Sequence, residues 1–185
     1  MLALRREHPA RALEIWFQDE ARFGQKGTLT RVWGLRGHRA VAPRQIGYEW
    51  TYMYGSVSPL TGRTHGLLLP YVNMEMMSLY LEDFSRVVEP EALAVMVCDQ
   101  AGWHTSGSLR VPPNVILLSL PPKAPELNPS ELIWREMRQK YLGNRVMVDE
   151  NEVVEQVCLA WNVLTADSFQ MQQLCGFNWI TEAIN

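Results

Sequence analysis

Three acidic residues, Asp19, Asp99 and Glu131, have the residue types of a metal-dependent phosphodiesterase site. Cutting or joining a DNA phosphodiester requires an activated oxygen nucleophile and relief of charge on the leaving oxygen, and two divalent ions roughly 3.5–4 Å apart provide both. Mg²⁺ is a hard cation that takes its ligands from carboxylates, water and substrate phosphates. Such a site therefore needs carboxylates that come from separate elements and meet at one edge of a sheet.

The first acid follows a predicted strand. Leu13, Ile15 and Phe17 recur at the two-residue period of a strand, and Asp19 ends that strand on the same face. An inward carboxylate without a partner is unfavourable, and a bound metal or exposure at the sheet edge removes that penalty. A turn residue at the strand end is the alternative interpretation of Asp19.

The other two acids also lie at element boundaries. Asp99 ends the continuous apolar run 93–98, which is typical of a strand buried on both faces. Glu131 is expected in the first turn of a helix that has Asn128 as its N-cap, Pro129 as its first residue, and an end near residue 142. Asp99 could instead open a turn, and Glu131 could be the glutamate of a capping box.

The remaining pattern predicts an α/β fold. Short strands are expected near 31–35, 48–57 and 63–69, then a helix capped by Asn73, the strand at 93–98, a short helix, a strand at 114–118, and further helices after Glu131, at 149–164 and 168–174. This order predicts a central mixed sheet, in which three antiparallel strands are followed by alternating helices and parallel strands, with extra C-terminal helices.

Charge is unevenly distributed along the chain. The net charge is −3, but residues 1–63 hold ten Lys/Arg against five Asp/Glu, and residues 64–185 hold seven against fifteen. The window 21–45 contains no acid and six basic residues, namely Arg22, Lys26, Arg31, Arg36, Arg39 and Arg44. A basic stripe of this kind can bind phosphate even in a mildly acidic chain, and a solvated basic loop is the alternative.

Bulk properties favour one globular domain. A chain of 185 residues with 47% hydrophobic and 20% charged residues can bury a core. We identify neither a membrane-spanning apolar run nor a signal peptide. The three cysteines, an odd number without a C-x-x-C pair, indicate a reducing cytoplasm rather than a disulfide framework.

Four sequence blocks resemble those of bacterial insertion-sequence transposases of the Tc/mariner-like DDE superfamily. They are Phe17-Gln-Asp-Glu20, Val32-Trp-Gly-Leu-Arg-Gly37, Cys98-Asp-Gln-Ala-Gly-Trp-His104 and Leu120-Pro-Pro-Lys-Ala-Pro-Glu-Leu-Asn-Pro-Ser-Glu-Leu-Ile-Trp134. The blocks occur in the family's order and span almost the whole chain. The last block, P-x-L-N-P-x-E-x-x-W, is the most specific.

The resemblance implies an RNase H-like, retroviral-integrase-like catalytic domain over residues 1–185. It implies two Mg²⁺ or Mn²⁺ ions at Asp19, Asp99 and Glu131, hydrolysis at transposon ends, and transfer of the 3′-hydroxyl to target DNA. It further implies that the chain binds double-stranded DNA and acts as a homodimer. The expected location is the bacterial cytoplasm, in association with the nucleoid. The family's N-terminal helix-turn-helix region is not seen, and the basic stretch at about 21–47 resembles a clamp-like insertion that reaches a partner subunit.

Residues beside the acids have open roles. His104, Lys123, Arg135 and Arg138 are candidate DNA contacts, as are the basic residues of the stripe. His104 could instead bond the backbone at a helix start, and the two arginines could pair with carboxylates. Glu20 is expected to form a salt bridge rather than bind metal. Trp134 is expected in the core.

Trp33 and Trp50 could stack on bases, but packing in the core is the favoured interpretation for both.

Two other functions also remain open from the sequence. One is an RNase H-like nuclease without strand transfer, and the other is a non-catalytic remnant that binds DNA or a partner transposase.

Overall fold

The computed structural model of the 185-residue chain describes residues 2–43, 45–102, 104, 108–122 and 124–184. Its centre is a five-stranded sheet in the order β3-β2-β1-β4-β5. The strands are β1 (Ala12–Gly24), β2 (Trp50–Val57), β3 (Thr64–Leu69), β4 (Ala92–Cys98) and β5 (Val115–Ser119). β1, β2 and β3 pair antiparallel, whereas β4 is parallel to both β1 and β5. The predicted mixed sheet is therefore confirmed.

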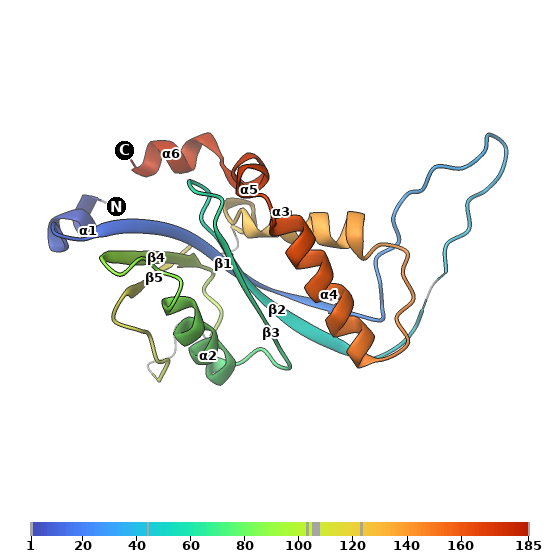
Figure 1. The fold of residues 1–185 in the computed structure, drawn as a ribbon, viewed down its shortest axis with the longest axis horizontal. Helices are drawn as coiled ribbons and strands as arrows, with labels where there is room; N and C mark the ends of the chain where they lie inside the picture. The colour runs from blue at the N-terminus through green and yellow to red at the C-terminus, as the bar shows by residue number, and fades with distance from the viewer. Residues whose placement is uncertain (1, 44, 103, 105–107, 123, 185) are drawn as a thin grey trace.

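Helices cover both faces of the sheet (Figure 1). They are α1 (Leu2–Glu7), α2 (Met74–Ser85), α3 (Ser130–Glu136), α4 (Glu150–Thr165), α5 (Ser168–Cys175) and α6 (Asn178–Ile184). A 3₁₀ turn, η1 (Pro125–Leu127), precedes α3, and a π-helical turn, η2 (Met137–Tyr141), continues it. Side chains of α3, α4 and α5 pack on one face of the sheet, and those of α2 pack on the other.

Alternation along β1 decides which face each residue serves. Ile15, Phe17, Ala21 and Phe23 belong to the core under α3 and α4, whereas Trp16 belongs to the core under α2. Because side chains alternate along a strand, Asp19 is on the α3 face and its neighbour is on the α2 face.

The prediction that Asp19 ends its strand is wrong, because β1 is longer than expected. Pairing with β4 stops at Phe17↔Val97, but pairing with β2 continues from Phe17↔Val57 to Gly24↔Trp50. Asp19 therefore lies in mid-strand, immediately beyond the part of β1 that the parallel strand covers. The basic insertion accordingly begins after Gly24 rather than at residue 21.

Two other local predictions are also wrong. No strand forms near 31–35, and the described residues between β4 and β5 contain no helix. The predicted cap of α3 is present, because Pro129 already has helical angles (φ −64°, ψ −17°) and Asn128 Oδ1 accepts the Ser130 N–H at 3.1 Å. Short apolar runs beside glycine and proline are ambiguous in sequence, and here no neighbouring strand is available to pair with 31–35.

The basic loop, which we define as residues 25–49, projects away from the sheet (Figure 1). Its base is fixed by hydrogen bonds to the segment between η2 and α4. Asn144 bonds the backbone of Thr30 through both its side-chain oxygen and nitrogen, at 3.0 Å each. Gln45 exchanges two bonds with the backbone of Met147. The described residues from 31 to 41 are exposed, so only the loop's base is held.

The preference for core packing of the two loop-side tryptophans is contradicted. Trp33 is fully exposed in the basic loop, and Trp50 is 43% exposed at the start of β2. Trp50 stacks instead with the Arg22 guanidinium, 5.4 Å from the ring centroid. Trp134, in contrast, is 1% exposed, which confirms its predicted place in the core.

Within the described residues, no helix is both long and apolar enough to cross a bilayer.

Candidate active site

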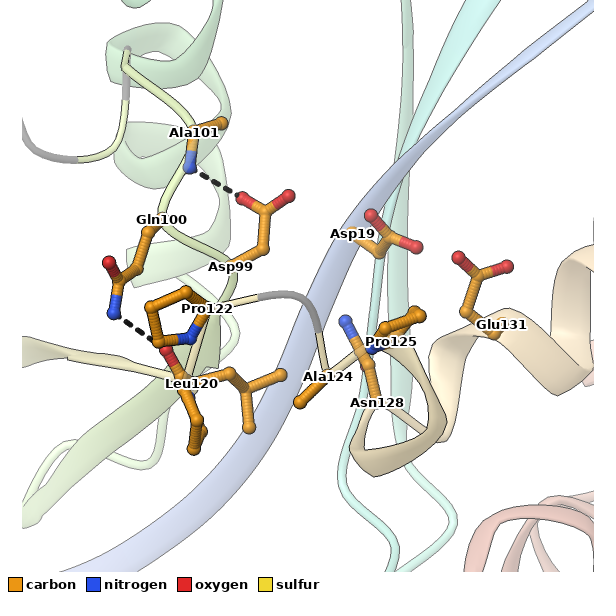
Figure 2. A pocket seen from close by; sticks show the side chains of 11 residues that line it. Asp19, Asp99, Gln100, Ala101, Leu120, Pro122, Ala124, Pro125, Asn128 and Glu131 are labelled. Carbon is orange, nitrogen blue, oxygen red and sulfur yellow. Dashed lines mark hydrogen bonds between the residues drawn. The ribbon is translucent and has the colours of Figure 1, made fainter.

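The three predicted acids line one pocket of about 460 Å³ (Figure 2). Asp19 comes from β1, Asp99 follows β4, and Glu131 is the second residue of α3. The carboxylates of Asp19 and Glu131 extend towards each other in Figure 2, and Asp99 faces them from across the pocket. The Pro-rich segment before α3 forms another wall, through Pro121, Pro122 and Pro125 among others.

Asp19 is half-buried and is held by two hydrogen bonds. The indole Nε1 of Trp134 donates to Asp19 Oδ2 at 2.9 Å, and the backbone N–H of Glu20 donates to Asp19 Oδ1 at 2.9 Å. Burial, followed by the charge of Glu131, raises the pKa of Asp19 to about 7, against the opposing effect of the Trp134 hydrogen bond. Burial and the nearby Glu131 carboxylate both disfavour the ionised form of Asp19, and a bound cation would stabilise that form.

This shift gives a stability prediction with a definite sign. Between about pH 4 and pH 7 the folded chain keeps a proton on Asp19 that the unfolded chain has lost. The free energy of unfolding therefore falls as pH rises across this window, and the loss is complete once pH has passed the folded pKa of about 7. The side chain of Asp19→Asn does not titrate, so this pH dependence is absent from the variant. We expect the free energy of unfolding of Asp19→Asn, relative to that of wild type, to rise by about 2–3 kcal/mol from pH 5 to pH 8 in metal-free buffer.

Urea unfolding at both pH values measures this difference. Adding Mn²⁺ at pH 8 should then stabilise wild type and leave Asp19→Asn unchanged, because the cation takes the place of the proton. A constant gap between the two proteins across this pH range would show that Asp19 is not the destabilised acid.

Asp99 is held at one oxygen and exposed at the other. Its Oδ1 accepts from the backbone N–H of Ala101 at 2.9 Å and lies 2.8 Å from Nδ1 of His104. The side chain of Gln100 donates to the carbonyl of Leu120 at 2.9 Å, which ties the chain after β4 to the end of β5. The Asp99 side chain is 58% exposed. The turn interpretation of Asp99 is thus correct, and it also leaves one carboxylate oxygen facing the pocket.

Glu131 does not act as a capping-box residue. The backbone N–H that a capping glutamate would bond belongs to Asn128, and it donates to the carbonyl of Pro125 at 2.9 Å. Asn128 and Ser130 are buried and donate their side-chain N–H and O–H to the carbonyls of Gln18 and Phe17. These two bonds fix the start of α3 against β1, one or two residues from Asp19.

The donor chemistry fits a hard divalent cation, because the pocket offers three carboxylates and no thiolate. Among the residues the structure describes, no three Asp, Glu, His or Cys side chains are already gathered into a metal site. Two of the three acids, Asp99 and Glu131, are exposed and sit on opposite walls. The pocket therefore has the ligands for a metal without the closed arrangement of a preformed one.

The predicted DNA-contact residues fall into three groups. Arg135 and Arg138 lie beside the site, in a shallow hollow next to α3 that Glu131 also lines. Within the described chain neither arginine forms an ion pair, and Arg138 lies over the Phe23 ring at 5.2 Å. The predicted residues of the stripe are exposed in β1 and the basic loop, at Arg22, Lys26, Arg31, Arg36 and Arg39.

The third is His104, which does not offer a surface contact. His104 is 7% exposed and its ring faces protein groups on both sides. The expected helix start at this residue is absent, although its predicted bond to the backbone is present, with Nδ1 at 3.1 Å from the Asp99 carbonyl. Arg44 and Lys123 lie outside the described residues.

Sequence reasoning missed the groups that support the acids. Trp134 was expected only to pack in the core, yet it donates a hydrogen bond to Asp19. Its position three residues after Glu131 on one helix was the available signal, because residues at that spacing share a face. Glu20 was predicted to form a salt bridge, and its partner is His104.

Comparisons with known proteins agree with this geometry. The family model described as DDE superfamily endonuclease matches residues 14–154, which include all three acids. The chain belongs to this superfamily. The resemblance inferred from the sequence blocks is thereby confirmed.

A curated relative of this DDE endonuclease domain is an uncharacterized protein of Sinorhizobium fredii, y4pE/y4sA. It is 41% identical over 130 residues, which cover 70% of this chain and 96% of the relative.

Solved structures of the Mos1 mariner transposase share the fold. The paired-end complex with the left transposon end aligns with a TM-score of 0.66 and 19% identity, over 95% of this chain and 55% of that one. The paired-end complex with Mn aligns with a TM-score of 0.64 and 17% identity, over 94% and 55%. The DDE endonuclease domain thus spans about half the length of these transposase chains. The predicted RNase H-like, transposase-type fold is confirmed.

Proposed function

We propose that the chain is the catalytic core of a DNA transposase, which hydrolyses phosphodiesters at transposon ends and transfers the resulting 3′-hydroxyl to target DNA. The observation that carries the proposal is the convergence of Asp19, Asp99 and Glu131 on one pocket from three separate elements. Membership of the DDE endonuclease superfamily supports the nuclease part. Mos1 structures with Mn and with Mg support the use of divalent ions in this fold.

In this proposal each acid is a metal ligand. Mg²⁺ or Mn²⁺ ions held by the three carboxylates would activate the attacking oxygen and neutralise charge on the leaving oxygen. The chain's own contribution is orientation. Trp134 fixes one oxygen of Asp19, the turn after β4 fixes one oxygen of Asp99, and Asn128 fixes the start of the Glu131 helix against β1.

The hollow beside Glu131 provides a path for the DNA backbone. It shares Glu131 with the acid pocket and presents Arg135 and Arg138, together with Thr28 from the basic loop. Charged hydrogen bonds from arginine to phosphate are strong and directional. We assign Arg135 and Arg138 to phosphates next to the scissile bond.

We assign the basic loop to a second subunit and its DNA in an active homodimer. The loop extends away from its own sheet and exposes large apolar side chains as well as basic ones, for example Val32, Trp33 and Leu35 beside Arg36. Exposed apolar groups concentrated on a projecting segment favour contact with another protein surface. Mos1 paired-end complexes are the structural precedent for an assembly on two transposon ends.

The test is an assay with pre-cut transposon-end duplexes and a supercoiled target, with Mg²⁺ or Mn²⁺. Metal-dependent nicking and covalent joining of the end to the target support the proposal. Nicking without joining would instead make the chain a nuclease of this fold, and neither activity would leave a DNA- or partner-binding remnant.

The basic loop has a separate test in the salt dependence of DNA binding. Each phosphate contact adds about 0.9 to the slope of log K against log salt, so replacing Arg31, Arg36 and Arg39 by Gln should lower the slope by about 2–3. The matched control replaces Arg5, Arg6 and Arg86, which are exposed arginines of α1 and the end of α2, away from the basic loop. Equal slopes for the two triple variants would remove the basic loop from the DNA-binding surface.

A further inference from the structure

A buried histidine connects β1, which carries Asp19, to the turn after β4, which carries Asp99. Nε2 of His104 lies 3.0 Å from Oε1 of Glu20, and Nδ1 lies 2.8 Å from Oδ1 of Asp99 and 3.1 Å from its carbonyl oxygen. The side chain of His104 is 1% exposed and that of Glu20 is 7% exposed. Glu20 follows Asp19 in β1, and its own N–H donates to Asp19 Oδ1.

The partners of the ring define its hydrogen-bonding role. The groups that these distances join to the two nitrogens are carboxylate and carbonyl oxygens, which only accept. The ring therefore bridges the Glu20 carboxylate and the turn that carries Asp99. A carboxylate as buried as that of Glu20 is unfavourable without a hydrogen-bond partner, so Glu20 and His104 hold each other in place.

This arrangement lies on the opposite side of β1 from Trp134. Asp19 and Trp134 are on the α3 face, whereas Glu20 is on the α2 face, because neighbouring residues of a strand point to opposite faces. β4 ends at Cys98, so Glu20 lies in the part of β1 beyond the end of β4, level with the turn that follows Asp99. His104 fills the space between Glu20 and this turn and contacts Asp99.

The consequence for Asp99 is a fixed orientation. Its Oδ1 is taken by His104 and by the N–H of Ala101, and its other oxygen is left for the pocket, on the side of Asp19 in Figure 2. Without these two contacts Asp99 would be an exposed side chain that rotates freely on a turn. The loss of its rotamer freedom would then oppose metal binding. A ligand oriented beforehand by its neighbours binds metal more tightly.

We propose that Glu20 and His104 form a positioning pair that holds Asp99 ready for the metal and couples it to Asp19. Neither residue is a metal ligand or a contact to DNA. This inference rests on the proposed metal-dependent function of the pocket. It assigns to Glu20 and His104 a role that the three acids alone do not describe.

The test measures Mn²⁺ affinity of the whole chain by electron paramagnetic resonance of free Mn²⁺, and nicking as a function of Mn²⁺ concentration. Glu20→Gln and His104→Gln should each weaken Mn²⁺ binding by about 10–100-fold. The double variant should be no weaker than the worse single one, because either change already breaks the pair. At saturating Mn²⁺ the nicking rate of the single variants should return to within about 3-fold of wild type, since the three ligands remain.

Glu14→Gln is the matched control. Glu14 is also a paired carboxylate on the α2 face of β1, 3.1 Å from the Arg63 guanidinium, but it lies six residues before Glu20, or about 20 Å along the strand. It should lower thermal stability as Glu20→Gln does and leave Mn²⁺ affinity unchanged. If Glu20→Gln and His104→Gln weaken Mn²⁺ binding no more than Glu14→Gln does, the pair is only structural and the inference is overturned.

Failure of the proposed function looks different. A wild-type chain that binds no Mn²⁺ overturns both the metal-dependent function and the positioning pair. Wild-type binding that Asp99→Asn abolishes, together with unaffected Glu20 and His104 variants, overturns the positioning pair alone.

Discussion

Asp99→Asn should abolish metal-dependent nicking of transposon-end DNA, with a loss on the order of 10³-fold or more, equivalent to about 4 kcal/mol of transition-state stabilisation. The substitution keeps the size of the side chain and can still accept the Ala101 hydrogen bond through its amide oxygen. It removes the negative charge that a divalent ion requires at the pocket. The nicking rate with Mg²⁺ and with Mn²⁺ measures the effect.

Asp83→Asn is the control for this substitution. Asp83 is also a partly exposed aspartate with a histidine neighbour, His65 at 3.3 Å, but it lies on α2 outside the acid pocket. Its variant should nick within about 2-fold of wild type, as expected for a surface change away from the site. Activity of Asp99→Asn that increases with Mn²⁺ as in wild type would mean that Asp99 is not a metal ligand.

Trp134→Ala should have the largest effect on stability, about 3–5 kcal/mol of unfolding free energy, because it empties a large volume in the main core. The ring is 1% exposed and packs against Trp161 at 5.8 Å and Phe23 at 6.1 Å between centroids. The core is also shaped around it. Gly55, opposite Asp19 in β2, has no room for a side chain, because a Cβ there would lie 2.4 Å from the indole. Urea unfolding measures the loss.

Trp134→Phe separates packing from the hydrogen bond to Asp19. It keeps much of the apolar volume but removes the indole N–H that lowers the pKa of Asp19, so that pKa should rise further and Mn²⁺ binding at neutral pH should weaken. Trp161→Phe makes a similar change in the same cluster without a bond to Asp19. Equal Mn²⁺ affinities of these two variants would show that the Trp134 indole supports the fold and not the site.

The elements that carry the acids were predictable because their signals are local. The apolar run before Asp99 became β4, and the Asn-Pro-Ser-Glu segment placed Glu131 in the first turn of a helix. The alternation through Phe17 placed Asp19 on the inward face of β1. Taken singly, each acid kept a structural explanation, and the four sequence blocks were needed to read the three as one site.

The tertiary structure decided how the acids are held. The length of β1 depends on β2, which pairs with it as far as Gly24, and no signal within residues 12–24 records that partner. The bond from Trp134 to Asp19 joins residues 115 positions apart, and that from His104 to Glu20 joins residues 84 apart. The sequence by itself therefore determined the elements that carry the three carboxylates, since strand and helix periods are local, and its four blocks grouped those carboxylates into one site. Only the packed fold determined which neighbours orient them, because those contacts exist once the sheet and its two helical layers have assembled.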